Sequence, residues 1–174
     1  MDGSPFRRVN DEVFYTTGDI ASVDGAAIGW LKERAAANPR RRARLCAHPG
    51  TDDTLHEMLI VHGMDAYVRP HRHLGKSESF HLIEGELSVL ILDDAGTVVR
   101  RIDMAAPGGD KPFFYRLSAP LFHTVVPRSE PVVFHEVTNG PFRREETEFA
   151  AFAPEESADP EEQRAYVRRL LSGT

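Results

Sequence analysis

The chain has 174 residues, 41% hydrophobic and 28% charged, which is typical of one globular domain with a real core. The formal net charge is −6, so no overall positive potential attracts nucleic acid. No apolar run approaches the ~20 residues of a membrane helix, and the N-terminal segment lacks the apolar stretch of a secretory signal. Cys46 is the only cysteine, which excludes an intramolecular disulfide. We therefore expect a cytoplasmic protein that binds neither nucleic acid nor membranes.

Residues 1–42 are expected to form an N-terminal hairpin and a helix. The runs EVFYTT and IASVD, within residues 12–24, are predicted to be two short strands because a Gly-Asp turn signal separates them. Asp24 then precedes a helix with apolar residues at helical spacing, and it is placed to cap that helix. The helix is expected to end at Asn38, since Pro39 disfavours helical backbone in the residue before it.

Residues 43–142 show the pattern of a β domain. Runs rich in Val, Ile, Leu, Phe and Tyr alternate with turn signals, and we count about seven strands, at the spacing of a sandwich or barrel. The sequence Asp94-Ala95-Gly96 joins LSVLIL to TVVRRI and predicts a hairpin.

Residues 143–174 form an acidic and then helical tail. Asp159 is placed to cap the last helix, and Pro160 fits its first position. The basic run at residues 40–44 contains no aromatic residue, so we expect it to be solvated or to pair with this tail rather than with nucleic acid. No linker separates the three parts, which predicts a single domain.

A histidine-rich stretch, VRPHRHLGKSESFHLIEG, carries the main chemical signal. His71 and His73 are two residues apart, so both face the same way in an extended strand. Glu78 begins the next strand, and His123 opens a later one. Three imidazoles and a carboxylate suit one divalent Fe, Mn, Co, Ni, Zn or Cu ion, and the ligand types alone do not choose among them. The alternative is that His-x-His is a polar surface pair.

The stretch resembles the first cupin motif. That motif has His-x-His, three or four residues, Glu, six residues and Gly, which His71, His73, Glu78 and Gly85 match in every spacing. The second cupin motif matches in part. His123 keeps its usual offset in SAPLFH, but the usual Pro and Gly positions differ, and Pro lies where the motif has Asn.

A narrower resemblance covers roughly residues 39–142. The segments ARLCAH, LHEML, LFHTVVP and FHEVTNGPF are similar to those of WbuC-type cupin fold metalloproteins. The resemblance implies an all-β double-stranded β-helix (a cupin, or jelly-roll, barrel) with one metal inside, held by His71, His73, Glu78 and His123. It also implies a homodimer and a link to surface-polysaccharide metabolism. The N-terminal hairpin and helix and the C-terminal helical tail would flank this barrel.

Four further residues are candidates for the chemistry. If the histidine pair faces the interior, a period of two places Tyr67 and Arg69 beside it. Tyr67 could donate a proton, and Arg69 could bind a carboxylate or phosphate of a substrate or instead pair with a surface acid. His135 and Glu136 alternate, so one faces inward as a candidate general base, and the sequence does not fix which.

We therefore expect a metal-dependent enzyme that acts on a small polar substrate such as a sugar or sugar nucleotide. Isomerisation or epimerisation is one version, and oxygen-dependent cleavage at iron is another. A cupin that binds a small ligand without turnover is the alternative. His81 lies three residues after Glu78 and should face away from the metal.

Overall fold

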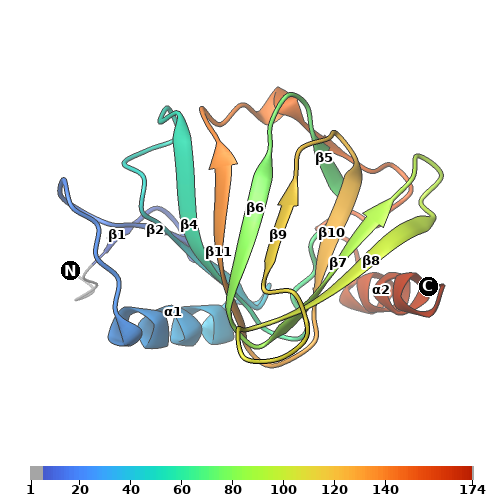
Figure 1. Ribbon diagram of the computed structural model, residues 1–174, viewed down its shortest axis with the longest axis horizontal. Helices are drawn as coiled ribbons and strands as arrows, with labels where there is room; N and C mark the ends of the chain where they lie inside the picture. Colours follow the sequence, from blue (N-terminus) through green and yellow to red (C-terminus); the bar gives the residue numbers. More distant parts are fainter. Residues whose placement is uncertain (1–5, 174) are drawn as a thin grey trace.

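The computed structural model describes residues 6–173, which form two β-sheets and two helices (Figure 1). The larger sheet has the strand order β1-β2-β3-β4-β11-β6-β9, and the smaller has the order β12-β5-β10-β7-β8. A short 3-10 helix precedes β12. The bounds are β1 Arg7–Arg8, β2 Val13–Tyr15, α1 Gly25–Ala37, β3 Arg42–Cys46, β4 Leu55–His62, β5 His71–His73, β6 Glu78–Glu84, β7 Glu86–Leu92, β8 Val98–Ala105, β9 Phe114–Leu117, β10 Phe122–Pro127, β11 Val132–Asn139, β12 Thr147–Phe149 and α2 Pro160–Ser172.

The main core lies between the two sheets. Strand β6 shows why, because Glu78, Phe80 and Leu82 are buried while His81 and Ile83 are exposed. This period of two turns one face of the strand towards the other sheet. The same alternation on neighbouring strands builds one apolar cluster, whose most buried members include Leu82, Leu87, Val89, Met104, Val132 and Phe134.

Each helix covers the outer face of one sheet. In α1, Leu31 and Ala35 pack against Leu45 and Val61 of the larger sheet. In α2, Tyr166 and Leu170 pack with residues of β7 and β10 in the smaller sheet. Figure 1 shows the two helices at opposite ends of the molecule. The inner faces of the two sheets therefore pack against each other, and a helix covers part of each outer face. This arrangement is that of the expected jelly roll, in the form of two facing sheets.

Several predicted local features are confirmed. The Asp24 carboxylate accepts a hydrogen bond from the backbone N–H of Ala27, and α1 ends at Ala37. The Asp159 carboxylate likewise caps α2. Strands β7 and β8 form the antiparallel hairpin expected around Gly96. Each of these features depends on contacts within a few residues, which the sequence shows directly.

The predicted N-terminal strand pair at residues 12–24 is wrong. Strand β2 is present, but IASVD forms no strand, and Ile20 is 85% exposed. Instead, β2 pairs with β1 in an antiparallel hairpin and with β3 in parallel. The run IASVD has suitable residues but no neighbouring backbone edge, and a strand needs one for its hydrogen bonds.

The strand count for the β domain is also wrong. Nine strands, β3 to β11, lie within residues 42–139 instead of about seven. Strands β5 and β9 have only 3 and 4 residues, which is too short for a period-two pattern to stand out. The sequence analysis also missed β12, which pairs with β5.

Gly85 is predicted to be required for the turn between β6 and β7. Its φ is +82°, and a Cβ there would lie 2.6 Å from the Pro131 carbonyl oxygen. We expect Gly85→Ala to lower the free energy of unfolding by at least ~2 kcal/mol, because left-handed backbone strain adds to this clash. Urea denaturation measures the change. The control is Gly29→Ala, where no atom lies within 4 Å of the added Cβ in α1, and this change should stabilise the protein. Equal stability of Gly85→Ala and wild type would contradict the prediction.

Candidate metal centre

Three strands bring the four predicted ligands together. His71 and His73 lie on β5, and His123 lies on the neighbouring strand β10, directly opposite His71. Glu78 begins β6, which belongs to the other sheet. The chain reverses through Gly75, whose φ is +77°. The carboxylate thus reaches the three imidazoles across the interior, from the facing sheet rather than from a neighbouring strand.

The four side chains converge on one point. One ligand atom from each of His71, His73, Glu78 and His123 lies within 4.8 Å of the others. The Nε2 atom of His123 lies 3.0 Å from Oε1 of Glu78, and Nε2 of His73 lies 3.4 Å from Oε2. These separations allow a single ion to contact all four atoms.

The other ring nitrogen of each histidine has a partner that orients it. The Nδ1 atom of His71 lies 2.9 Å from the Arg69 carbonyl oxygen, and Nδ1 of His123 lies 3.0 Å from the Leu121 carbonyl oxygen. Since a carbonyl only accepts, both rings carry their proton on Nδ1 in these contacts, which leaves Nε2 as a free electron-pair donor. Nδ1 of His73 lies 3.2 Å from the Thr147 hydroxyl. Such second contacts are typical of metal-binding histidines.

Two buried atoms at the centre support a fit to a cation. Oε1 of Glu78 and Nε2 of His123 are buried, and neither has a hydrogen-bond partner among the described residues. They are close enough for an ion pair, but their angles do not suit a hydrogen bond. Unsatisfied buried polar atoms are costly, and a bound cation would satisfy both. The donor set therefore fits a divalent transition metal.

The pKa values of the candidate ligands also bear on metal binding, which needs neutral imidazoles and an ionised carboxylate. Burial lowers the pKa of His71 to about 3, so its imidazole is neutral near neutral pH. Burial would raise the pKa of Glu78, but the adjacent His123 holds it below its ordinary value. Burial alone would lower the pKa of His123, yet the Glu78 carboxylate raises it. A metal that binds Nε2 of His123 needs that nitrogen without a proton, so metal binding should be favoured as the pH rises through the pKa of His123.

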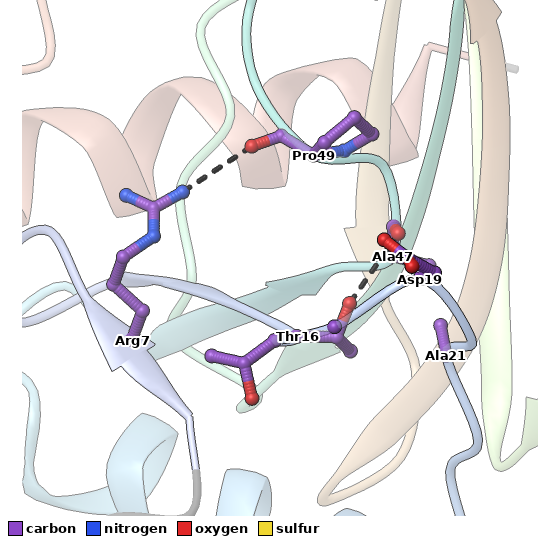
Figure 2. Close-up of a pocket in the computed structure, with 8 residues that line it drawn as sticks. Arg7, Thr16, Asp19, Ala21, Ala47 and Pro49 are labelled. Carbon is purple, nitrogen blue, oxygen red and sulfur yellow. Dashed lines mark hydrogen bonds between the residues drawn. The ribbon is translucent and has the colours of Figure 1, made fainter.

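The candidate ligands lie on the wall of a cavity of about 710 Å³ between the sheets. This volume suits a small organic ligand. The polar groups near the ligands include Arg69, Lys76, Glu136, Thr138 and Asn139. A pocket of about 520 Å³ lies elsewhere, where loops around Thr16, Asp19 and Pro49 meet Arg7 (Figure 2). No histidine lines it, so the first cavity is the better candidate.

Arg69 lines the cavity as expected, but Tyr67 does not. The Arg69 guanidinium donates to the Ala150 carbonyl oxygen at 3.0 Å and lies 3.9 Å from the surface residue Glu155, while its binding of a substrate group stays a prediction. The Tyr67 hydroxyl donates to the Pro154 carbonyl oxygen, and its ring packs with the cluster beneath α2. The expected interior position of Tyr67 is therefore wrong, because β5 begins only at His71 and the preceding backbone is not a strand.

The structure settles the phase of β11. Glu136 lines the cavity, and burial together with the nearby Glu78 charge raises its pKa to about 8. His135 faces the outer side, where its Nε2 lies 3.8 Å from Glu57. His81 is exposed beside Phe113, as predicted. Of the two candidate bases, only Glu136 faces the cavity.

Three further histidines line the cavity: His48, His56 and His62. The rings of His48 and His56 stack at 4.1 Å. For His56 and His62 the sequence signal is the alternation in LHEMLIVH, where every second residue from His56 to His62 is buried and faces inward. None of the three belongs to the group of four that could bind a metal.

His62 should make stability depend on pH. Burial lowers its folded-state pKa from 6.5 to about 3, so the unfolded chain binds more protons below pH 6.5. The contribution of neutral His62 is complete above pH 6.5. It should be lost by about 1.4 kcal/mol per pH unit as the pH falls towards 3. We expect His62→Leu to flatten the stability profile between pH 6.5 and 5 in urea denaturation. His81→Leu, on the outer face, should keep the wild-type profile, and parallel profiles for all three proteins would contradict the prediction.

Comparisons with known proteins agree on the fold. A family model described as a domain of unknown function, DUF6016, matches residues 23–104. No curated protein matches the chain significantly. A crystal structure of CapF with the inhibitor 3-isopropenyl-tropolone superimposes with a TM-score of 0.54 and 12% identity, over 64% of this chain and 32% of CapF. The chain thus spans about a third of the CapF length.

Two more solved structures are similar over most of their length. Recombinant oxalate oxidase in complex with glycolate gives a TM-score of 0.52 and 15% identity, over 79% of this chain and 76% of the oxidase. Protein SO0799 from Shewanella oneidensis gives 0.50 and 10%, over 73% and 77%. CapF and oxalate oxidase are cupins, and at these identities the likeness shows the fold alone. The chain therefore has a cupin fold. Within residues 6–173, no helix is long and apolar enough to cross a membrane.

Proposed function

We propose that the chain binds one divalent transition metal through His71, His73, Glu78 and His123 and acts as a metal-dependent enzyme. The observation that carries the proposal is the convergence of three imidazole nitrogens and one carboxylate within 4.8 Å on the wall of a cavity. A structural metal is normally enclosed by its ligands, whereas a catalytic one faces space for a substrate. The large adjoining cavity therefore supports a catalytic site.

Two side chains of the cavity have suitable chemistry for a reaction. The Arg69 guanidinium is anchored by Ala150, which fixes a cation beside the ligands for an anionic substrate group. Glu136, with a pKa of about 8, holds its proton near neutral pH and could donate it to a substrate oxygen. When bound, the metal would supply a Lewis acid that polarises an oxygen atom.

We further propose a small polar substrate, with a sugar or sugar nucleotide of surface-polysaccharide metabolism as the first class to test. Isomerisation or epimerisation fits a proton donor such as Glu136 beside a polarising cation. Oxygen-dependent cleavage at iron is the alternative chemistry, since histidine and carboxylate ligands also suit iron.

Turnover tests the proposal. Purified protein is loaded with each candidate metal and incubated with a panel of sugar nucleotides and keto acids, and product and oxygen consumption are measured. We expect product that depends on metal and falls at least about 100-fold in Glu136→Gln, while the metal content stays unchanged. Binding of a substrate without product for any metal would favour the non-catalytic binding module instead.

We also propose that the protein is a cytoplasmic homodimer. The outer strands of each sheet offer unpaired backbone groups for association. Strand β9 is one such edge, and Phe114 on it is exposed. Light scattering on the purified protein would give a mass close to 19.5 kDa if this proposal is wrong, and about twice that mass if it holds.

A further inference from the structure

Strands β1 to β3 form one wall of the cavity, and this wall carries two arginines that have no acidic partner within residues 6–173. Arg44 lies on the cavity side of β3, while Ala43 and Leu45 face α1. Within residues 6–173, its guanidinium makes no hydrogen bond or ion pair. Arg7 also lines the cavity, donating to the Pro49 carbonyl oxygen at 3.3 Å and lying 4.5 Å from the centre of the Tyr15 ring. In the described part of the chain, no carboxylate forms an ion pair with either arginine.

Two other cations of the same cavity, Arg42 and Lys76, have carboxylate partners, while Arg69 lies beside the candidate ligands. Arg42 pairs with Glu12 at 3.0 Å and with Glu156 at 3.2 Å. Lys76 pairs with Glu146 at 3.0 Å. Among residues 6–173, the positive charge of the β1–β3 wall that has no carboxylate partner belongs to Arg7 and Arg44.

The positive charges of Arg7 and Arg44 influence the same two side chains, Cys46 and Tyr15. Burial raises the pKa of the Cys46 thiol, and the positive charges of Arg44 and Arg7 oppose that rise. Both also oppose the rise in the pKa of Tyr15 that burial causes. An anion near Cys46 and Tyr15 would thus be attracted by two cations at once.

This cationic end is separate from the candidate metal centre. Strands β4 and β11 lie between β3, which carries Arg44, and β6, which carries Glu78. At ~4.8 Å per strand, the lateral separation along the sheet is ~14 Å. Between the two ends, the cavity wall carries apolar side chains of Met58, Ile60 and Phe134 beside the polar His56, Glu136 and Thr138. One small oxyanion cannot contact both ends.

We propose that Arg44, assisted by Arg7, binds a carboxylate or phosphate at the far end of an elongated substrate whose other end contacts the His71, His73, Glu78 and His123 group. This inference rests on the proposed function and narrows its substrate class. The substrate has a metal-chelating head, a middle section that spans the wall formed by β4 and β11, and an oxyanion remote from the head. The planar fork of an arginine suits such an oxyanion, because it can donate two parallel hydrogen bonds.

A series of linear dicarboxylates tests the spacing. Binding of each member, from oxalate to dodecanedioate, is measured calorimetrically on the metal-loaded protein and on its Arg44→Gln variant. We expect the affinity to rise to a maximum at a chain length that spans both ends. Arg44→Gln should weaken the best-fitting member about tenfold and leave oxalate unchanged, because oxalate reaches only the metal. Arg128→Gln removes an exposed arginine outside the cavity and should change neither.

Two results would overturn the inference. One is equal binding of the long dicarboxylates to wild type and Arg44→Gln. The other is an equal loss of oxalate and long-chain binding, which would mean that Arg44 acts through the fold. Arg44→Lys keeps the charge without the fork and should recover part of the long-chain affinity, which separates recognition from folding.

Inorganic phosphate separates this inference from the proposed function. In chelator-treated protein, phosphate should still shift the Nε–H nuclear magnetic resonance signals of Arg44 and Arg7 in a saturable way. If the protein binds no metal but these shifts occur and vanish in Arg44→Gln, the proposed function fails and the oxyanion site stands. If metal binds normally and phosphate causes no such shifts, the oxyanion site fails alone.

Discussion

Glu78→Gln should reduce the metal content of the purified protein to below about a tenth of the wild-type value at equal metal supply. Glu78 is the one carboxylate in the group of four, and it enters from the sheet that faces the three histidines. Loss of a mere second contact to a metal ligand typically costs 10–100-fold in affinity, so loss of a ligand should cost at least as much. Elemental analysis after reconstitution and dialysis measures the content.

The glutamine variant separates metal binding from folding. Glutamine keeps the shape of the buried side chain and removes only the charge, so the unfolding transition should remain cooperative. Glu84→Gln is the matched control, since Glu84 ends the same strand and pairs with Lys32 on the outside. It should retain the full metal content. A Glu78→Gln protein with wild-type metal content would remove Glu78 from the site.

The histidine pair shows what the sequence could predict about the site. The spacing of His71, His73 and Glu78 follows from two strands and one turn, so a local motif indicates the ligands before any fold is known. The motif does not show that β5 and β6 lie in opposite sheets. That arrangement depends on long-range pairing of β5 with β10 and β12, which no short pattern encodes.

The alternation of side chains along a strand gave a wrong prediction for Tyr67 and an incomplete one for Glu136. Tyr67 lies outside any strand, so an alternation counted back from His71 does not apply to it. Glu136 lies within a regular strand, but alternation alone allows either phase. The phase is fixed by β4 and β6 on both sides of β11, where Met58 and Phe80 flank Glu136. Such information comes only from the assembled sheet.

The surroundings of the residues that line the cavity also depend on how the strands and the C-terminal tail come together. Arg44 belongs to the basic run at residues 40–44, which is predicted from the sequence to be solvated or to pair with the acidic tail. Arg42 of that run does pair with Glu156, whereas Arg44 is exposed on the cavity side of β3 and forms no ion pair within residues 6–173. Two side chains of one type, two residues apart, therefore have different surroundings because the tail reaches only one of them.

Phe134→Ala should destabilise the protein by ~3–5 kcal/mol, which is a large fraction of the stability of a typical domain. Phe134 is 1% exposed and lies at the centre of the larger sheet, on β11. Its ring centre lies 5.2 Å from that of Phe80 and 5.3 Å from that of His62. Truncation removes contacts on both sides and leaves a cavity that the flanking strands cannot fill. Urea denaturation at neutral pH measures the loss.

The same change should also weaken metal binding, although Phe134 belongs to no ligand set. Phe80 packs on Phe134 and lies two residues from Glu78 on β6, so a looser contact frees the strand that presents the carboxylate. Phe114→Ala is the control, because Phe114 is 55% exposed on β9 and its loss should cost no more than ~0.5 kcal/mol. If Phe134→Ala lost stability but kept wild-type metal affinity, Glu78 would be held by its own turn at Gly75 rather than by the core. The metal centre and the core would then be independent parts of the fold.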